Sequence, residues 1–147
     1  MPMKKKILVI DDEADIREIV RIYLEEEGCE VIEASNGQEG ILKAQSERPD
    51  LIVLDIMLPG INGFEVAKHL KDDPNTQDIP VIILSVLAQD SQYRQGILDY
   101  ISKPFRQEEL VATVRRIFSK VNGKGPKKSI LVGDDLLFDT FGDPEVF

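Results

Sequence analysis

Residues Leu51 to Asp55 read LIVLD, four consecutive aliphatic side chains that end at a carboxylate. A short continuous apolar run is typical of a strand that is buried on both faces, whereas a strand with one solvated face would alternate. Residues 7–10 (ILVI) and 81–84 (VIIL) repeat the pattern. We therefore predict that these three runs form the central strands of a sheet.

Two weaker runs, residues 30–34 and 100–101, are more polar and predict edge strands. Between the five runs lie segments whose apolar residues recur at helical spacing, and these are residues 14–27, 37–46, 64–71, 89–98 and 108–121. Alternation of strand and helix favours a parallel sheet covered on both faces. Right-handed crossovers then favour the strand order 2-1-3-4-5, so the predicted fold is a flavodoxin-like doubly wound α/β sheet with five strands and five helices.

The chain has 147 residues, a formal net charge of -9 and a single cysteine, Cys29. An acidic surface repels phosphates, so we expect no direct nucleic-acid binding by this segment. The apolar run at 7–10 is interrupted at once by Asp11, and no stretch approaches the ~20 apolar residues of a membrane span. We expect a cytoplasmic chain without membrane contact.

The composition changes after Asn122. Residues 123–128 (GKGPKK) are typical of a linker, which predicts one domain over 1–122 and a linker and tail over 123–147. Within the tail, residues 130–135 (ILVGDD) are similar to residues 7–12 (ILVIDD). This segment is either the start of a second, truncated unit of the same kind or a chance match between two strand-like patterns.

Polar side chains follow four of the predicted strands. These are Asp11 and Asp12, Asp55, Ser85, and Lys103 one residue beyond Ser102. In an open α/β sheet the carboxyl ends of the strands border the ligand site, so we expect these side chains to converge. An acid after a strand can instead cap the next helix, but capping accounts for only one of the three carboxylates. Three crowded acids favour a bound cation, and Mg²⁺ prefers such oxygen ligands.

The full set of motifs resembles response regulator receiver domains of two-component signalling over about residues 5–121. The motifs are Asp11-Asp12, Asp55 with the following LPGING of residues 58–63, Ser85, and YISKPF of residues 100–105. The same resemblance implies the 2-1-3-4-5 strand order.

The resemblance implies a role for each residue. Asp55 would accept a phosphoryl group from a histidine kinase or phosphotransfer protein. Mg²⁺ would be held by Asp11, Asp12, Asp55 and the main-chain carbonyl of Met57, while Lys103 would neutralise the phosphoryl oxygens. Ser85 would bind a phosphoryl oxygen and Tyr100 would rotate inward, so that a protein-interaction surface changes.

The implied partners are a sensor histidine kinase, an output domain or partner protein, and a second copy of the chain on phosphorylation. The expected chemistry is limited to self-phosphotransfer and autodephosphorylation, so the chain is not expected to be an enzyme acting on other substrates.

The segment between Ser85 and Lys103 departs from the family pattern, because it is about one helical turn short. The fourth helix should therefore be shortened. Val86 is bulkier than the small residue usual after the switch hydroxyl, so Val86→Ala is expected to speed autodephosphorylation.

Two alternative functions stay open. One is a pseudo-receiver, an interaction module with impaired switching. The shortened helix leaves this alternative open, whereas the presence of all five key residues argues against it; these are Asp11, Asp12, Asp55, Ser85 and Lys103. The other is a magnesium-dependent aspartyl-phosphate phosphatase of the haloacid dehalogenase type. That class has a second acid two residues after the nucleophile, where this chain has Met57.

Overall fold

The computed structural model describes residues 2–85, 100–102, 105–122, 131–132 and 136–137. For residues 85, 100–102, 120–122, 131–132 and 136–137 the description covers the backbone alone. In chain order the elements are β1 (Lys6–Ile10), α1 (Ala14–Glu25), β2 (Glu30–Ala34), α2 (Gly37–Glu47), β3 (Leu51–Leu54), α3 (Gly63–Asp72), β4 (Val81–Ser85), β5 (Tyr100–Ser102), α5 (Gln107–Asn122), β6 (Leu131–Val132) and β7 (Leu136–Leu137).

The main sheet has the order β2-β1-β3-β4-β5, and all neighbouring strands are parallel. The predicted flavodoxin-like α/β architecture is therefore confirmed. The predicted fourth helix, residues 89–98, lies outside the described residues. Its shortened length and the full count of five strands and five helices consequently stay predictions.

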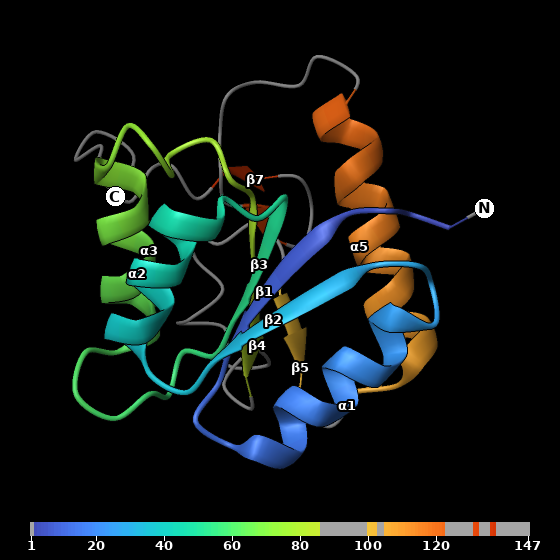
Figure 1. Ribbon diagram of the computed structural model, residues 1–147, viewed down its shortest axis with the longest axis horizontal. Coiled ribbons are helices and arrows are strands. Elements are labelled where there is room, and N and C mark those ends of the chain that lie inside the picture. The colour runs from blue at the N-terminus through green and yellow to red at the C-terminus, as the bar shows by residue number, and fades with distance from the viewer. Residues whose placement is uncertain (1, 86–99, 103–104, 123–130, 133–135, 138–147) are drawn as a thin grey trace.

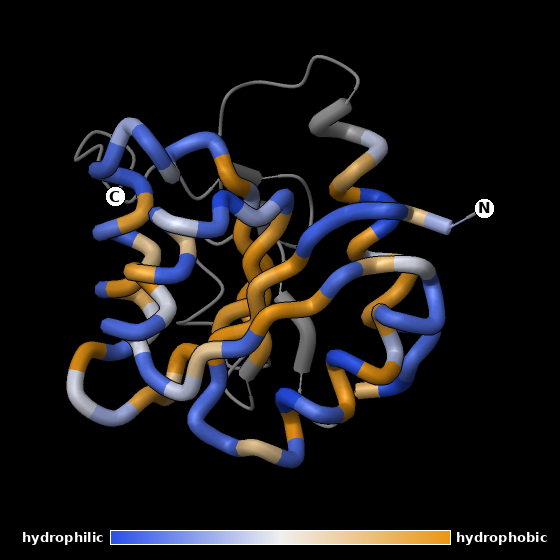
Figure 2. Tube along the Cα trace, in the orientation of Figure 1, coloured by the Kyte–Doolittle hydropathy of each residue, from blue (hydrophilic) through white to orange (hydrophobic). Residues whose placement is uncertain are grey.

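Helices cover both faces of the sheet (Figure 1). Helices α1 and α5 contact each other on one face, and α2 and α3 contact each other on the opposite face. Every residue of β3 is buried, as are residues 7–10 of β1 and 81–84 of β4. Figure 2 shows the same strands as the apolar centre of the molecule. Strand β2, which was predicted to be an edge, is buried fully only at Ala34.

Helix α1 ends at Glu25, two residues before the predicted limit. The reason is a glycine-based helix end. Gly28 has φ of 90°, its N–H donates to the carbonyl of Glu25 (3.0 Å), and the N–H of Cys29 donates to the carbonyl of Leu24 (3.1 Å). These two bonds satisfy the last carbonyls of the helix and turn the chain into β2.

The tail contributes a two-stranded antiparallel pair, in which Leu131 faces Leu137 and Val132 faces Leu136. Most of residues 123–147 lie outside the described part of the chain, so the division at 122 and the second-unit interpretation stay predictions. No helix in the described ranges is long and apolar enough to cross a membrane.

Candidate functional site

Three carboxylates meet at the carboxyl ends of β1 and β3. Asp11 and Asp12 follow β1, and Asp55 follows β3 directly. One carboxylate oxygen from each lies within 4.8 Å of the others. Asp11 and Asp55 are buried, with exposed fractions of 0% and 4%, while Asp12 is exposed. The convergence predicted for these acids is thus present.

The backbone of Asp55 is fixed by the sheet and by the loop that follows it. Its N–H donates to the carbonyl of Ile10 (2.9 Å), and its Oδ1 accepts from the N–H of Met57 (3.1 Å). The N–H of Gly63 donates to the carbonyl of Ile56 (2.8 Å), so α3 begins directly against this loop. The position of Asp55 therefore depends on main-chain contacts from β1 and α3.

Asp11 is also held from several sides. Its N–H donates to the carbonyl of Ala34 (3.1 Å), and its Oδ1 accepts from the N–H of Glu13 (2.9 Å). Its carbonyl accepts from Nη1 of Arg17 (2.7 Å). A buried carboxylate is costly unless it is hydrogen-bonded, and the bond from Glu13 helps to offset that cost. The bonds to Ala34 and Arg17 hold the main chain of Asp11 in place.

The acid group fits a small divalent cation. Two unit charges ~4 Å apart repel by roughly 4 kcal/mol at an effective dielectric near 20, and here three acids approach one another. A cation bound between them would remove that repulsion. The donor set consists of carboxylate oxygens, which suits Mg²⁺ better than the softer metals that choose nitrogen or sulfur.

An open hollow lies beside the acids. It is lined by Asp12, residues 56–59, Asn62 and Phe64. The side chains of Ile56 and Leu58 are buried and hold this loop against the core, whereas the side chain of Met57 between them is exposed. The side chain of Asn62 accepts from the N–H of Glu65, and the carboxylate of Glu65 accepts from the N–H of Asn62. This capping box fixes the end of the loop at the start of α3. A substrate group could thus reach the acids from solvent along a stable loop.

The remaining predicted site residues are described in part. The backbone of Ser85 ends β4 opposite Ser102, and Tyr100 pairs with Ile83. Ser85 and Ser102 therefore lie at the same edge of the sheet as the acids. Lys103 and Val86 lie outside the described residues, and the side chains of Ser85 and Tyr100 are not described.

A family model, response regulator receiver domain, matches residues 7–115. The chain belongs to this family. Among curated relatives of this receiver domain, the phosphate regulon transcriptional regulatory protein PhoB of Pseudomonas aeruginosa is 42% identical over 137 residues, which cover 90% of this chain and 60% of PhoB. The transcriptional regulatory protein ResD of Bacillus subtilis is 38% identical, with coverage of 91% and 59%. The chain thus spans about 60% of the length of these relatives.

Solved structures agree with this assignment. Chemotaxis response regulator CheY4 of Vibrio cholerae has a TM-score of 0.72 at 30% identity, over 78% of this chain and 99% of CheY4. NtrX of Brucella abortus has a TM-score of 0.73 at 30% identity, over 83% of this chain and 29% of NtrX. The receiver fold therefore occurs both alone and as part of a longer protein among its structural neighbours.

Two residues that shape the receiver site were missed in the sequence. Arg17 binds the main chain of Asp11, and Gly63 packs against the main chain of Asp55. The predicted helix began one residue after Gly63, although the preceding Asn62 is a common N-cap residue and signals a helix start at Gly63. Nothing in the sequence distinguishes Arg17 from Arg21 on the same helix, because their different contacts depend on the tertiary fold.

Proposed function

We propose that this receiver domain accepts a phosphoryl group on Asp55 in a magnesium-dependent reaction and thereby changes a protein-interaction surface. The observation that carries the proposal is the group of three carboxylates, Asp11, Asp12 and Asp55, with ligand oxygens within 4.8 Å of one another. Membership of the receiver family supports assigning the phosphoacceptor role to Asp55, the acid that follows the central strand β3.

The reaction is a displacement at phosphorus. A carboxylate oxygen of Asp55 forms a bond to the phosphorus of a phosphohistidine on the partner, while the phosphorus–nitrogen bond breaks and the imidazole leaves. The product is an acyl phosphate on Asp55. Water attack on the same phosphorus later releases inorganic phosphate and restores the carboxylate.

The side chains of Asp11, Asp12 and Asp55, with the carbonyl of Met57, would hold Mg²⁺. When bound, the ion supplies positive charge to the transferring phosphoryl oxygens. The hydrogen bonds of Asp55 to Ile10 and Met57 hold it in position before the donor arrives. Less conformational entropy is therefore lost when the phosphoryl group is transferred.

We assign Lys103 and Ser85 to the phosphoryl oxygens, the first by charge and the second by a hydrogen bond. Tyr100 would follow Ser85 and alter the exposed surface. These assignments rest on the family motifs. The fold supports them through the backbones of Ser85 and Tyr100, which lie in neighbouring strands β4 and β5.

A histidine kinase or phosphotransfer protein is the proposed phosphodonor. Because the curated relatives are transcriptional regulators that extend well beyond this length, we propose an output domain or partner protein as the recipient of the signal. Homodimerisation on phosphorylation, a cytoplasmic location and the lack of direct nucleic-acid binding by this acidic segment belong to the same proposal.

The test is phosphorylation by acetyl phosphate and MgCl₂, followed by intact mass. The 147-residue chain should gain one phosphoryl group, and Asp55→Ala should gain none. Asp72→Ala is the matched control, since Asp72 is an exposed aspartate at the far end of α3. Absence of any gain in the unmodified chain would contradict the proposal and favour a pseudo-receiver. Multiple turnover of unrelated phosphoesters would favour the phosphatase.

A further inference from the structure

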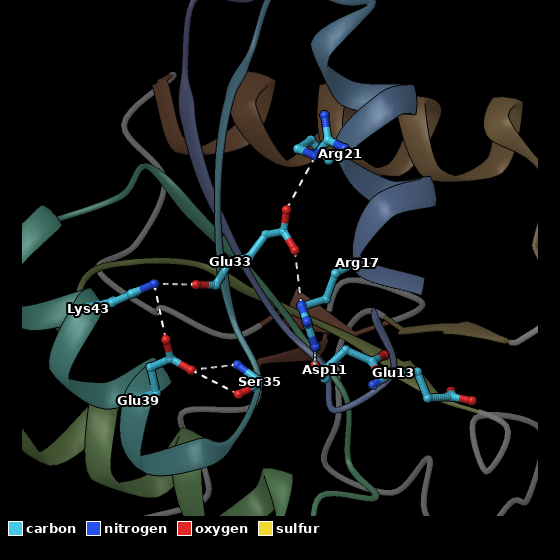
Figure 3. Close-up of polar contacts among 8 residues, drawn as sticks. All are labelled: Asp11, Glu13, Arg17, Arg21, Glu33, Ser35, Glu39 and Lys43. Atoms are coloured by element: carbon cyan, nitrogen blue, oxygen red, sulfur yellow. Dashed lines mark hydrogen bonds and ion pairs between the residues drawn. The ribbon is translucent and has the colours of Figure 1, made fainter. Parts of the chain in front are cut away.

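Arg17 connects the acid group to a network of charges on the outside of the sheet (Figure 3). Its guanidinium donates twice, from Nη1 to the main-chain carbonyl of Asp11 (2.7 Å) and from Nε to Oε1 of Glu33 (3.0 Å). One planar group thus joins the loop after β1 to a side chain of β2. The planar arginine fork presents its donors in a fixed geometry, so that one group can bind both acceptors at once.

Glu33 is itself held on two further sides. Its Oε2 pairs with Nε of Arg21 (3.3 Å), and its carbonyl accepts from Nζ of Lys43 (2.6 Å). Lys43 also pairs with Glu39 (3.2 Å), whose carboxylate accepts from the N–H of Ser35 (2.8 Å). The carboxylate that orients Arg17 is therefore also held by Arg21 of α1, while Lys43 of α2 holds the main chain of Glu33.

The arginines differ in what they contact. The side chain of Arg17 is 17% exposed, against 35% for Arg21. Figure 3 places Arg21 on the far side of Glu33 from Asp11, so Arg21 shares the ion-pair network while Arg17 reaches the acidic loop. This difference supplies a matched pair of equally charged residues on one helix.

We propose that Arg17 is a positioning residue for the metal site, because it holds the main chain of Asp11 where the carboxylates of Asp11 and Asp12 meet Asp55. The inference rests on the proposed function, since it requires Mg²⁺ to bind these acids. Mutual repulsion among the acids would move the loop outward when no cation is bound. The charge-assisted bond from Arg17 to the Asp11 carbonyl opposes that movement without occupying a carboxylate oxygen that a cation needs.

The sign of the effect on Mg²⁺ affinity separates positioning from simple charge. Arg17 carries a positive charge near the acids, so its removal should strengthen cation binding if charge alone mattered. Loss of positioning has the opposite result, because the acids must then be reorganised before they bind the ion. Residues that orient metal ligands commonly change affinity by about 10- to 100-fold, which exceeds the effect of one solvent-screened charge.

The experiment measures the Mg²⁺ dissociation constant of the unphosphorylated 147-residue chain by MgCl₂ titration, followed through the amide NMR signals of Asp12 and Met57. We expect Arg17→Ala to bind about tenfold more weakly, near the lower end of that range. Arg21→Ala should bind as the unmodified chain does or slightly more tightly. Arg17→Lys, which keeps the charge and lacks the fork, should also bind more weakly.

Equal or tighter Mg²⁺ binding by Arg17→Ala, with normal binding by the unmodified chain, would overturn the inference and leave the proposed function intact. Absence of Mg²⁺ shifts in the unmodified chain would overturn both. Thermal unfolding of each variant shows whether it is folded at the titration temperature. If Arg17→Ala is unfolded at the titration temperature, the Mg²⁺ affinity of Arg17→Lys is used instead. An affinity of Arg17→Lys equal to that of the unmodified chain would then refute the inference.

Discussion

Gly63 packs against the main chain at Asp55 so closely that a side chain on it has no space. A Cβ atom at Gly63 would lie 2.5 Å from Cα of Ile56 and nearer still to the carbonyl oxygen of Asp55. Backbone atoms cannot swing aside as the end of a flexible side chain can. The first turn of α3 and the residue after β3 must therefore separate if Gly63 is replaced.

We predict that Gly63→Ala lowers the free energy of unfolding by about 3 kcal/mol, the upper end of the cost of overpacking, and slows phosphorylation of Asp55. Gly60→Ala is the control, because Gly60 has nothing within 4 Å of the added atom and only its φ of 77° opposes alanine. That strain should cost about 1 kcal/mol. Urea denaturation measures both variants, and equal losses would show that the Gly63 contact is not the cause.

Asp12→Asn should make the metal-free domain more stable, because it removes one charge from the group of three acids. Because Asp12 is exposed, water screens its charge, and the gain in the free energy of unfolding should be about 1 kcal/mol, the value for two charges ~4 Å apart in bulk water. Saturating MgCl₂ should reverse the order of stability, since the unmodified chain binds the ion more tightly and therefore gains more linkage free energy than the variant.

The control for this change is Asp15→Asn, an equal charge change in the first turn of α1. An acid there interacts favourably with the helix dipole, so this variant should lose about 0.3–1 kcal/mol with or without MgCl₂. Thermal unfolding in EDTA and in MgCl₂ measures all three proteins. The same sign of change for both variants in EDTA would argue against repulsion within the acid group.

Arg48→Gly should stabilise the domain. Arg48 follows α2 with φ of 48° and ψ of 62°, a left-handed conformation that costs a residue with a Cβ about 1–2 kcal/mol. Glycine removes that cost but adds about 0.4–1 kcal/mol of unfolded-state entropy, so the expected net gain is about 0.5–1 kcal/mol. The bond from Arg48 to Asn75 is long (3.4 Å) and exposed, and its loss matters little.

Arg48→Ala separates strain from the lost side chain, because it removes the same bond and keeps the left-handed backbone. It should show no comparable gain in urea denaturation. A gain in Arg48→Ala equal to that in Arg48→Gly would mean that the arginine side chain, and not the backbone, destabilises this helix end.

Glu39 should make stability depend on pH in the acidic range. Its pKa is lowered from an ordinary value of 4.5, mainly because the N–H of Ser35 donates to the carboxylate, with a further contribution from Lys43. A lowered folded-state pKa stabilises the fold above the unfolded value of 4.5, and this stabilisation is lost as the pH falls through the folded-state pKa. The stability difference between the unmodified chain and Glu39→Gln should therefore be constant near neutrality and shrink below about pH 4.5.

Carboxyl NMR titration tests the cause of the lowered pKa. Ser35→Ala retains the main-chain donor and should keep most of the lowering, while it loses the hydroxyl bond of 3.0 Å. A return of the Glu39 pKa to its ordinary value in Ser35→Ala would contradict the main-chain explanation.

The central strands could be predicted from sequence because burial on both faces requires uninterrupted aliphatic residues, as in LIVL at 51–54. The acid group could be predicted because each carboxylate follows such a run. Helix ends were less accurate, since α3 starts at Gly63 through the Asn62 cap and α1 ends at Glu25. Local hydrogen bonds determine where a helix begins and ends, and the spacing of apolar residues does not predict these bonds.

Contacts between distant elements could not be predicted. The bond from Arg17 to Asp11 requires Glu33 of β2 to orient the guanidinium, and the approach of Gly63 to Asp55 requires α3 to fold back on β3. Such contacts depend on the relative placement of whole elements, which the spacing of residues along the chain does not specify.

Asp55, the proposed phosphorylation site, contacts its neighbours in the sheet and in α3 through main-chain atoms. Phosphorylation of its side chain does not alter these atoms. The amide of Asp55 is bonded to Ile10 in the adjacent strand, and its carbonyl abuts Gly63. Successive cycles of modification and hydrolysis can therefore change the charge at this point while the strand keeps its register. Reversibility of the signal is thus compatible with a rigid fold, because restoring the carboxylate requires no refolding.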